Sequence, residues 1–197
     1  MPKKKQPNKT KKDSNTLRII GGEWRSRKLT FIDALGLRPT PDRVRETLFN
    51  WLQMDIRNAR CLDLFTGSGA LGLEALSRGA REVVFVEKNA AIVNQLRENL
   101  AILNPESEVL QADALSYLDH LDPSTEAFDM IFLDPPYRQG LLEKSLKRLS
   151  AKNAINSNTL IYLEHESEEM FDWSDYGMEV LKKKSAGQVQ SYLLKQL

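Results

Sequence analysis

Short apolar runs of strand length alternate with longer segments of helical periodicity along most of the chain. The apolar runs are 61–65, 83–87, 109–111, 128–133 and 160–163, and the helical segments between them lie near 70–78, 89–103, 114–121 and 141–150. Strands that alternate with helices in this way form a parallel sheet that is covered by helices on both faces. We therefore predict an α/β fold that binds its ligands at the carboxyl ends of the strands.

A further helix is predicted before the first of these strands. Thr40 is a suitable N-cap, and Pro41 is a residue favoured at the first helical position. Apolar residues then recur at helical spacing from Val44 to Leu52. The pattern predicts a helix over 41–54.

Each end of the chain has the pattern of a hairpin. Segments 17–20 and 23–31 flank Gly21-Gly22, which predicts two short strands around a glycine turn. Segments 178–184 and 189–195 flank a second glycine-containing turn and predict an antiparallel pair at the end of the sheet.

Length and composition agree with one soluble domain. The chain has 197 residues, a single cysteine and no apolar run of the ~20 residues that a membrane helix needs. We expect no membrane segment, no secretory signal and no disulfide, and hence a reducing, cytoplasmic location. Cys61 lies within a predicted strand and is expected to be a core residue, and His120 and His165 have no partners at metal-ligand spacing, so no metal is expected.

Charge is distributed unevenly along the chain. Residues 1–45 hold 13 Lys or Arg and 4 Asp or Glu, a net charge of +9, whereas residues 46–197 hold 15 and 23, a net charge of −8. Residues 1–16 have no apolar side chain besides Met1, so they are predicted to be a disordered basic tail, which could serve only for solubility. The asymmetry favours a polyanion-binding front on a mildly acidic body.

The basic front suggests contact with RNA. Cations around an aromatic side chain can hold phosphates and stack on bases. The candidate RNA-binding residues are Arg18, Trp24, Arg25, Arg27, Lys28, Arg38, Arg43 and Arg45. Two alternatives stay open: Trp24 could pack against the body, and the arginines at 38–45 could form ion pairs that cover the cofactor pocket.

A glycine-rich loop follows the first strand of the body. Gly67, Gly69 and Gly72 form G-x-G-x-x-G, which permits close approach to a nucleotide and tight packing of helix on strand. Asp63 stands before the loop, where its charge would repel the phosphates of a dinucleotide. The sulfonium and ammonium of S-adenosylmethionine avoid this repulsion, so we predict that cofactor over NAD, with Asp63 as a turn carboxylate as the alternative.

Acidic residues after the next two strands complete the predicted cofactor site. Glu87 is placed to accept hydrogen bonds from ribose hydroxyls, and Asp113 to accept from the adenine amino group or, alternatively, to cap the next helix. The predicted cofactor-binding residues are Asp63, Thr66, Gly67, Ser68, Gly69, Glu87, Lys88, Asp113, Ala114 and Asp134.

The fourth strand ends in Asp134-Pro135-Pro136-Tyr137, the predicted catalytic residues. The two prolines make a stiff loop without backbone N–H donors, so the loop offers only acceptors. An exocyclic amine on a base needs two acceptors, which the Asp134 carboxylate and a proline carbonyl supply, and Tyr137 can stack on the base. The loop therefore predicts methyl transfer to a base amine.

Taken together, these segments resemble the RsmD family, bacterial methyltransferases that modify a guanine N2 in 16S ribosomal RNA. The resemblance is carried by RIIGGEWRSRKL (18–29), LRPTPDRVRETLFNWL (37–52), LDLFTGSGALGLEALSRGA (62–80), DPPY (134–137) and AGQVQSYLL (186–194). It implies a Rossmann-like class I fold with seven strands, the last of them antiparallel, and S-adenosylmethionine as the methyl donor. Its substrate would be 16S rRNA within the small ribosomal subunit or an assembly intermediate.

The resemblance also implies a domain organisation and site roles. We expect a basic tail over 1–16, an RNA-binding hairpin extension over 17–36, and a methyltransferase domain over 37–197, acting as a monomer. Family roles would fall to Gly67, Gly69, Glu87 and Asp113 for the cofactor and to 134–137 for the amine. The alternatives are a DNA adenine-N6 or cytosine-N4 methyltransferase, a nicotinamide oxidoreductase and a non-catalytic ribosome-binding factor.

Overall fold

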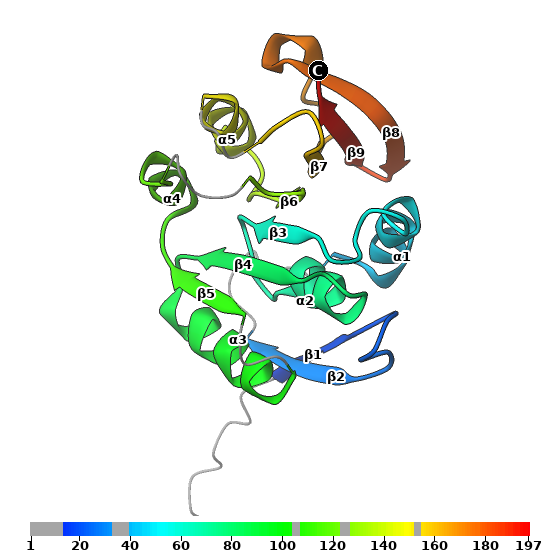
Figure 1. Cartoon of the computed structure of the whole chain (residues 1–197), viewed down its shortest axis with the longest axis vertical. Helices are drawn as coiled ribbons and strands as arrows, with labels where there is room; N and C mark the ends of the chain where they lie inside the picture. Colours follow the sequence, from blue (N-terminus) through cyan, green and yellow to red (C-terminus); the bar gives the residue numbers. More distant parts are fainter. Residues whose placement is uncertain (1–13, 33–39, 104–106, 123–126, 152–154) are drawn as a thin grey trace, which may run out of the picture.

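A seven-stranded sheet forms the centre of the computed structural model, which describes residues 14–32, 40–103, 107–122, 127–151 and 155–197 (Figure 1). Its strands stand in the order β5-β4-β3-β6-β7-β9-β8. They are β3 (Arg60–Asp63), β4 (Glu82–Glu87), β5 (Glu108–Gln111), β6 (Met130–Leu133), β7 (Leu160–Glu166), β8 (Met178–Ala186) and β9 (Val189–Gln196). β3 to β7 pair in parallel and β9 is antiparallel to both of its neighbours, which confirms the predicted fold class.

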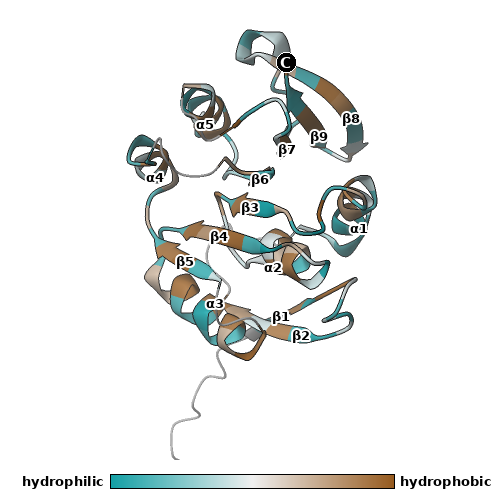
Figure 2. Ribbon diagram, viewed as in Figure 1, coloured by the Kyte–Doolittle hydropathy of each residue, from teal (hydrophilic) through white to brown (hydrophobic). Residues whose placement is uncertain are grey.

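Helices cover both faces of the sheet, because successive strand residues alternate between two separate cores. One face packs on α1 (Asp42–Trp51), α2 (Ala70–Ser77) and α3 (Ala90–Leu103), and the other on α4 (Ala114–Asp119), α5 (Leu141–Ser150) and the short 3₁₀ helix η1 (Trp173–Tyr176). Hydrophobic and hydrophilic bands alternate along α3, as expected for a helix with one buried face (Figure 2). The sequence pattern did not predict η1.

The N-terminal hairpin exists, but its strands and turn differ from the prediction. β1 (Ser14–Arg18) pairs antiparallel with β2 (Lys28–Ile32), and the glycines lie in a longer loop over 19–27. The predicted tail over 1–16 therefore extends too far, since the strand begins at Ser14; residues 1–13 lie outside the described residues. A Cβ on Gly22 would lie 1.8 Å from the Ser77 carbonyl oxygen, so this loop touches α2 directly.

The hairpin shares a core with the body of the protein. Leu17, Leu29 and Phe31 are buried in the same cluster as α2 and α3, and the hairpin lies beside these helices in Figure 1. Because the hairpin has no separate core, it is a layer added to the α1–α3 face rather than an independent module.

The start of α1 corrects one sequence-based prediction. The helix begins at Asp42 with Pro41 at the N-cap position and no side-chain cap, and it ends at Trp51 rather than at 54. Thr40 instead donates its hydroxyl hydrogen to the Asp134 carboxylate, 3.3 Å away. A residue predicted to cap a helix therefore contacts the predicted catalytic loop.

Candidate active site

Four carboxylates stand at the carboxyl ends of adjacent parallel strands, on the same face of the sheet. Each is two positions beyond a strand residue whose side chain is buried in the core beneath α1, α2 and α3, so all four point to that side. We call this group the carboxylate row: Asp63 of β3, Glu87 of β4, Asp134 after β6 and Glu164 of β7.

Asp63 contacts the first turn of α2, as the alternative interpretation of a turn carboxylate expects, and its cofactor role stays a prediction. Its side chain is buried and accepts a hydrogen bond from the Gly72 backbone N–H at 3.0 Å. Burial raises the pKa of Asp63 to about 7, against the effect of the Gly72 hydrogen bond, and the charges of Asp134 and Glu87 raise it further. Asp63, Asp134 and Glu87 therefore lie close enough together for their charges to act on one another.

The glycine loop has the geometry that its sequence predicts. Gly67 donates its N–H to Glu87 at 3.0 Å, and Gly69 starts α2 with φ of 78°. A Cβ on Gly72 would lie 2.2 Å from the Phe85 ring, so only glycine permits this contact of α2 with β4. Thr66 fixes the loop by donating its hydroxyl hydrogen to the Asp63 carbonyl at 2.8 Å.

The remaining predicted cofactor residues lie around this loop or at the start of α4. Asp113 caps α4 by accepting from the Leu115 and Ser116 N–H groups at 3.0 and 3.1 Å, which is the alternative left open for it. Ser68 and Ala114 are buried, and Lys88 is exposed beside Glu87. A role for Asp113 toward adenine stays a prediction.

The Asp134-Pro135-Pro136-Tyr137 corner is open to solvent. Pro135 is buried, Pro136 is exposed, and Tyr137 is 40% exposed. The three residues after Asp134 line a pocket of about 300 Å³, together with Glu164 and Phe171. Desolvation raises the pKa of Asp134 to about 6, against the effect of the hydrogen bond from Thr40.

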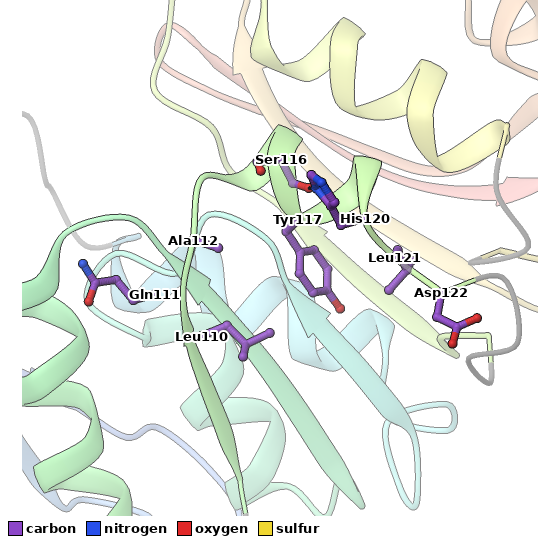
Figure 3. A pocket seen from close by; sticks show the side chains of 8 residues that line it. All are labelled: Leu110, Gln111, Ala112, Ser116, Tyr117, His120, Leu121 and Asp122. Carbon is purple, nitrogen blue, oxygen red and sulfur yellow. Dashed lines mark hydrogen bonds between the residues drawn. The ribbon is translucent and has the colours of Figure 1, made fainter.

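A second pocket lies between α4 and β5, and no residue of the carboxylate row lines it. It measures about 360 Å³, and Figure 3 shows the Tyr117 ring of α4 projecting toward β4 and β5 there. Burial raises the pKa of Tyr117 to about 12. The charges that act on Tyr117 come from Arg60, Glu82 and Glu108, at the amino ends of the strands. Gln111 and Ala112 in the lining of this pocket directly precede the predicted cofactor residues Asp113 and Ala114.

The prediction that Trp24 and Arg45 contact RNA is wrong, because both side chains are buried in this structure. Trp24 is 6% exposed and packs in the core, and its backbone N–H donates to Ser77, so its ring cannot stack on a base. Arg45 is 1% exposed and pairs with Asp42 at 2.6 Å, which is the ion-pair alternative. Trp24 and Arg45 are buried because they join the hairpin and α1 to α2.

The other predicted RNA-binding residues remain on the surface or lie outside the described residues. Arg25, Arg27, Lys28 and Arg43 are exposed. Arg18 is also exposed but pairs with Asp42 at 2.7 Å. Arg38 lies outside the described residues.

Cys61 is a core residue, as expected, whereas His165 lines the same pocket as Tyr137 and Glu164. Cys61 is fully buried, and burial raises the pKa of its thiol. His165 stacks on Tyr192 in an aromatic cluster, and burial lowers the pKa of its ring. Over the described ranges, no three Asp, Glu, His or Cys side chains form a possible metal site, and no helix is long and apolar enough to cross a membrane.

Sequence reasoning missed three residues that the structure places at or near the site. Thr40 contacts Asp134, and Glu164 completes the carboxylate row. Strand alternation alone could have indicated Glu164, which stands two positions after the inward-facing Tyr162. Glu74 of α2 is fully buried and joins the hairpin to α1; its only sequence signal is one carboxylate in an otherwise apolar helix.

Comparison with known proteins decides the family. Residues 17–195 match the family described as Conserved hypothetical protein 95. Ribosomal RNA small subunit methyltransferase D of Escherichia coli (strain K12) is 45% identical over 186 residues, which cover 94% of this chain and 91% of that protein. The chain belongs to the RsmD family of methyltransferases. The Haemophilus influenzae protein of the same name is 44% identical and covers 91% of this chain and 93% of its own.

Solved structures agree with this membership of the RsmD family. The Escherichia coli protein yhhF superposes with a TM-score of 0.82 at 43% identity, over 92% of this chain and 98% of that one. The Thermus thermophilus 16S rRNA N2 G1207 methyltransferase RsmC, in complex with AdoMet and guanosine, has a TM-score of 0.68 at 20% identity. It covers 93% of this chain and 50% of its own, and at that identity it shows the shared fold alone.

Proposed function

We propose that this protein transfers a methyl group from S-adenosylmethionine to the exocyclic N2 amine of a guanine in 16S ribosomal RNA, within the small subunit or an assembly intermediate. The observation that carries the proposal is the open corner after Asp134, where Pro135, Pro136 and Tyr137 line a pocket together with Glu164 of the carboxylate row. The names of the RsmD relatives support ribosomal RNA of the small subunit as the substrate.

The residues of the site fit S-adenosylmethionine as the cofactor. Asp63, Glu87 and Asp134 concentrate negative charge around the glycine loop, and their mutual repulsion is one cause of the raised pKa of Asp63. A ligand with a pyrophosphate would add to that repulsion, whereas a sulfonium and an ammonium would relieve it. Glu87 would hold the ribose hydroxyls. When bound, S-adenosylmethionine supplies a methyl carbon on a positively charged sulfur.

The corner can orient the amine that receives the methyl group. The Asp134 carboxylate and a proline carbonyl would each accept one N–H of the amine, which directs the nitrogen lone pair toward the methyl donor. Tyr137 would stack on the base plane, at about 1–3 kcal/mol by comparison with other base–aromatic contacts. A carboxylate whose pKa is raised to about 6 is also suited to accept the proton that the nitrogen releases.

Exposed cations on the hairpin and α1 would hold the RNA backbone. Arg25, Arg27, Lys28 and Arg43 are available for phosphates, which fix the orientation of an RNA without naming a base. A DNA adenine-N6 or cytosine-N4 methyltransferase remains the second candidate, since the same tetrapeptide would serve any base amine.

The proposal is tested with methyl-labelled S-adenosylmethionine and three substrates: small subunits from cells that lack this protein, rRNA extracted from those subunits, and DNA. The products are digested to nucleosides and identified by mass spectrometry. We expect label in the ribosomal samples, as N2-methylguanosine. Label in DNA alone would favour the second candidate, and the absence of any transfer would favour a non-catalytic ribosome-binding factor.

A further inference from the structure

Glu164 is a buried acidic side chain that the proposed methyl transfer does not yet use. It is 5% exposed, it belongs to the carboxylate row, and it lines the same pocket as Pro136 and Tyr137. Leu133 and Leu163 are register partners in the parallel pair of β6 and β7, so Asp134 and Glu164 stand side by side at the ends of these strands. The two carboxyl groups therefore lie close together, near enough for the charge of Asp134 to act on Glu164.

The hydrogen bonds of Glu164 are incomplete. A carboxylate can accept about four hydrogen bonds, but among the described residues the one hydrogen-bond donor to its side chain is the Tyr162 hydroxyl, 2.6 Å from Oε1. No Lys or Arg of the described segments pairs with it; the nearby Arg138 pairs with Glu166 instead, at 3.0 Å. The second oxygen of Glu164 has no partner among the described residues and is not closed off from solvent, so it is suited to a ligand that brings N–H groups.

The Watson–Crick edge of guanine presents such donors in a row. Its N1–H lies next to the two N–H bonds of the N2 amine, whereas adenine and cytosine place an acceptor at the position beside their amine. In its ionised form, which arriving N–H donors stabilise, a carboxylate is only an acceptor, so it attracts the guanine edge and repels the other two. A base lifted from its RNA would also find Tyr137 and Phe171 in the pocket for ring contact.

We propose that the Glu164 carboxylate accepts the N1–H of the target guanine while Asp134 accepts from its N2 amine, so that Glu164 selects guanine over adenine and cytosine. This inference rests on the proposed function. It makes Glu164 a specificity-determining residue of the RsmD-family site. The alternative is that Glu164 only accepts the hydrogen bond from Tyr162, in which case its replacement would not change which base is bound.

The first test measures methyl transfer. Glu164→Gln keeps the shape and can still accept from Tyr162, but it loses the charge. Glu168→Gln is the matched control, because Glu168 is an exposed carboxylate on the same segment. With small subunits as substrate, kcat/KM should fall about 10- to 150-fold for Glu164→Gln, the usual loss for a hydrogen bond to a charged group, while cofactor affinity and the Glu168→Gln variant stay at the wild-type level.

The second test isolates the N1–H. Binding of guanosine 5′-monophosphate and 1-methylguanosine 5′-monophosphate is followed through the Tyr137 ring signals in NMR spectra. The wild type should bind the unmethylated nucleotide more tightly, and the difference should vanish in Glu164→Gln. The inference would be overturned if the wild type bound both nucleotides with the same affinity, or bound neither. Full methyl-transfer activity of Glu164→Gln would also overturn it.

The outcomes separate this inference from the proposed function. A wild type that methylates rRNA but is insensitive to Glu164→Gln removes the inference and leaves the function. A wild type that distinguishes the two nucleotides but transfers no methyl group to rRNA removes the function and supports the role of Glu164.

Discussion

Two buried acidic sites in this protein differ in how completely they are partnered. Glu74 accepts from the Ile20 and Gly21 backbone N–H groups at 2.8 Å each, from Arg78 at 2.7 Å and from Arg45 at 3.5 Å. Among the residues that the structure describes, the carboxylates of Asp134 and Glu164 each accept one hydrogen bond, from Thr40 and Tyr162. The Glu74 carboxylate has its hydrogen-bond partners without a ligand, whereas the carboxylates of Asp134 and Glu164 have acceptor positions left for one.

This difference separates a structural carboxylate from candidate ligand-binding ones. Glu74 joins the hairpin, α1 and α2, and Arg45 continues the network by donating to the Thr40 carbonyl at 3.2 Å. Thr40 in turn donates a hydrogen bond to Asp134, so the network around Glu74 helps to position Asp134. Because an unpaired buried polar group is costly, groups left with few partners are expected where a ligand will bind.

The largest effect on stability is expected at Glu74. Glu74→Gln should lower the free energy of unfolding by about 3–5 kcal/mol, since it leaves the buried Arg45 guanidinium without one of its counter-charges. Urea denaturation measures this change. Glu82→Gln is the control: Glu82 pairs with Arg60 near the surface, and its loss should cost about 0–1 kcal/mol. Equal losses for both variants would contradict the structural role of Glu74.

Asp134 should show the opposite behaviour, with a large loss of activity and little loss of stability. Asp134→Ala should lower the single-turnover rate of methyl transfer about 10²- to 10³-fold, the usual effect of removing one group that orients the reacting atoms, and should affect cofactor binding far less. Calorimetric titration of S-adenosylmethionine measures the binding. Asp55→Ala, on an exposed residue, is the control. Unchanged turnover in Asp134→Ala would remove its catalytic role.

The carboxylate row should also make the free energy of unfolding depend on pH, because burial raises the pKa values of its carboxyl groups. The raised pKa values, about 7 for Asp63, about 6 for Asp134 and about 8 for Glu164, mean that the folded protein binds more protons than the unfolded chain between pH 5 and 8. Stability should therefore fall as the pH rises through this window, by at most about 1.4 kcal/mol per pH unit for each group. Glu164→Gln should make the fall shallower, which urea midpoints measured at several pH values can detect.

The smallest effect is expected on the basic surface of the hairpin. Replacing Arg25, Arg27 and Lys28 by alanine should weaken RNA binding and make the slope of log affinity against log salt shallower by about 2 to 3. Lys144→Ala on α5, away from the hairpin, is the control. An unchanged slope would show that the hairpin cations do not contact phosphate.

Local patterns in the sequence predicted the fold and the glycine loop, because strand alternation and glycine spacing are set by near neighbours along the chain. The errors concern residues whose partners are distant. Trp24 lies among basic residues and Arg45 is itself a cation, so the sequence predicts that both lie on an RNA-binding surface. Contacts with α2, more than 25 positions away along the chain, bury both of them. Thr40 has the features of a helix cap, and its partner Asp134 is 94 positions away. No local pattern specifies such contacts.

The most direct test of the difference between Glu74 and the pair Asp134 and Glu164 is a carboxyl NMR titration with ¹³C-labelled Asp and Glu, with and without S-adenosylmethionine. In the free protein, the carboxyl groups of Asp134 and Glu164 should titrate well above their ordinary pKa values, and the bound cation should lower both pKa values. Titration near the ordinary values of 3.8 and 4.5, with no response to the cofactor, would contradict the view that these carboxylates await a ligand.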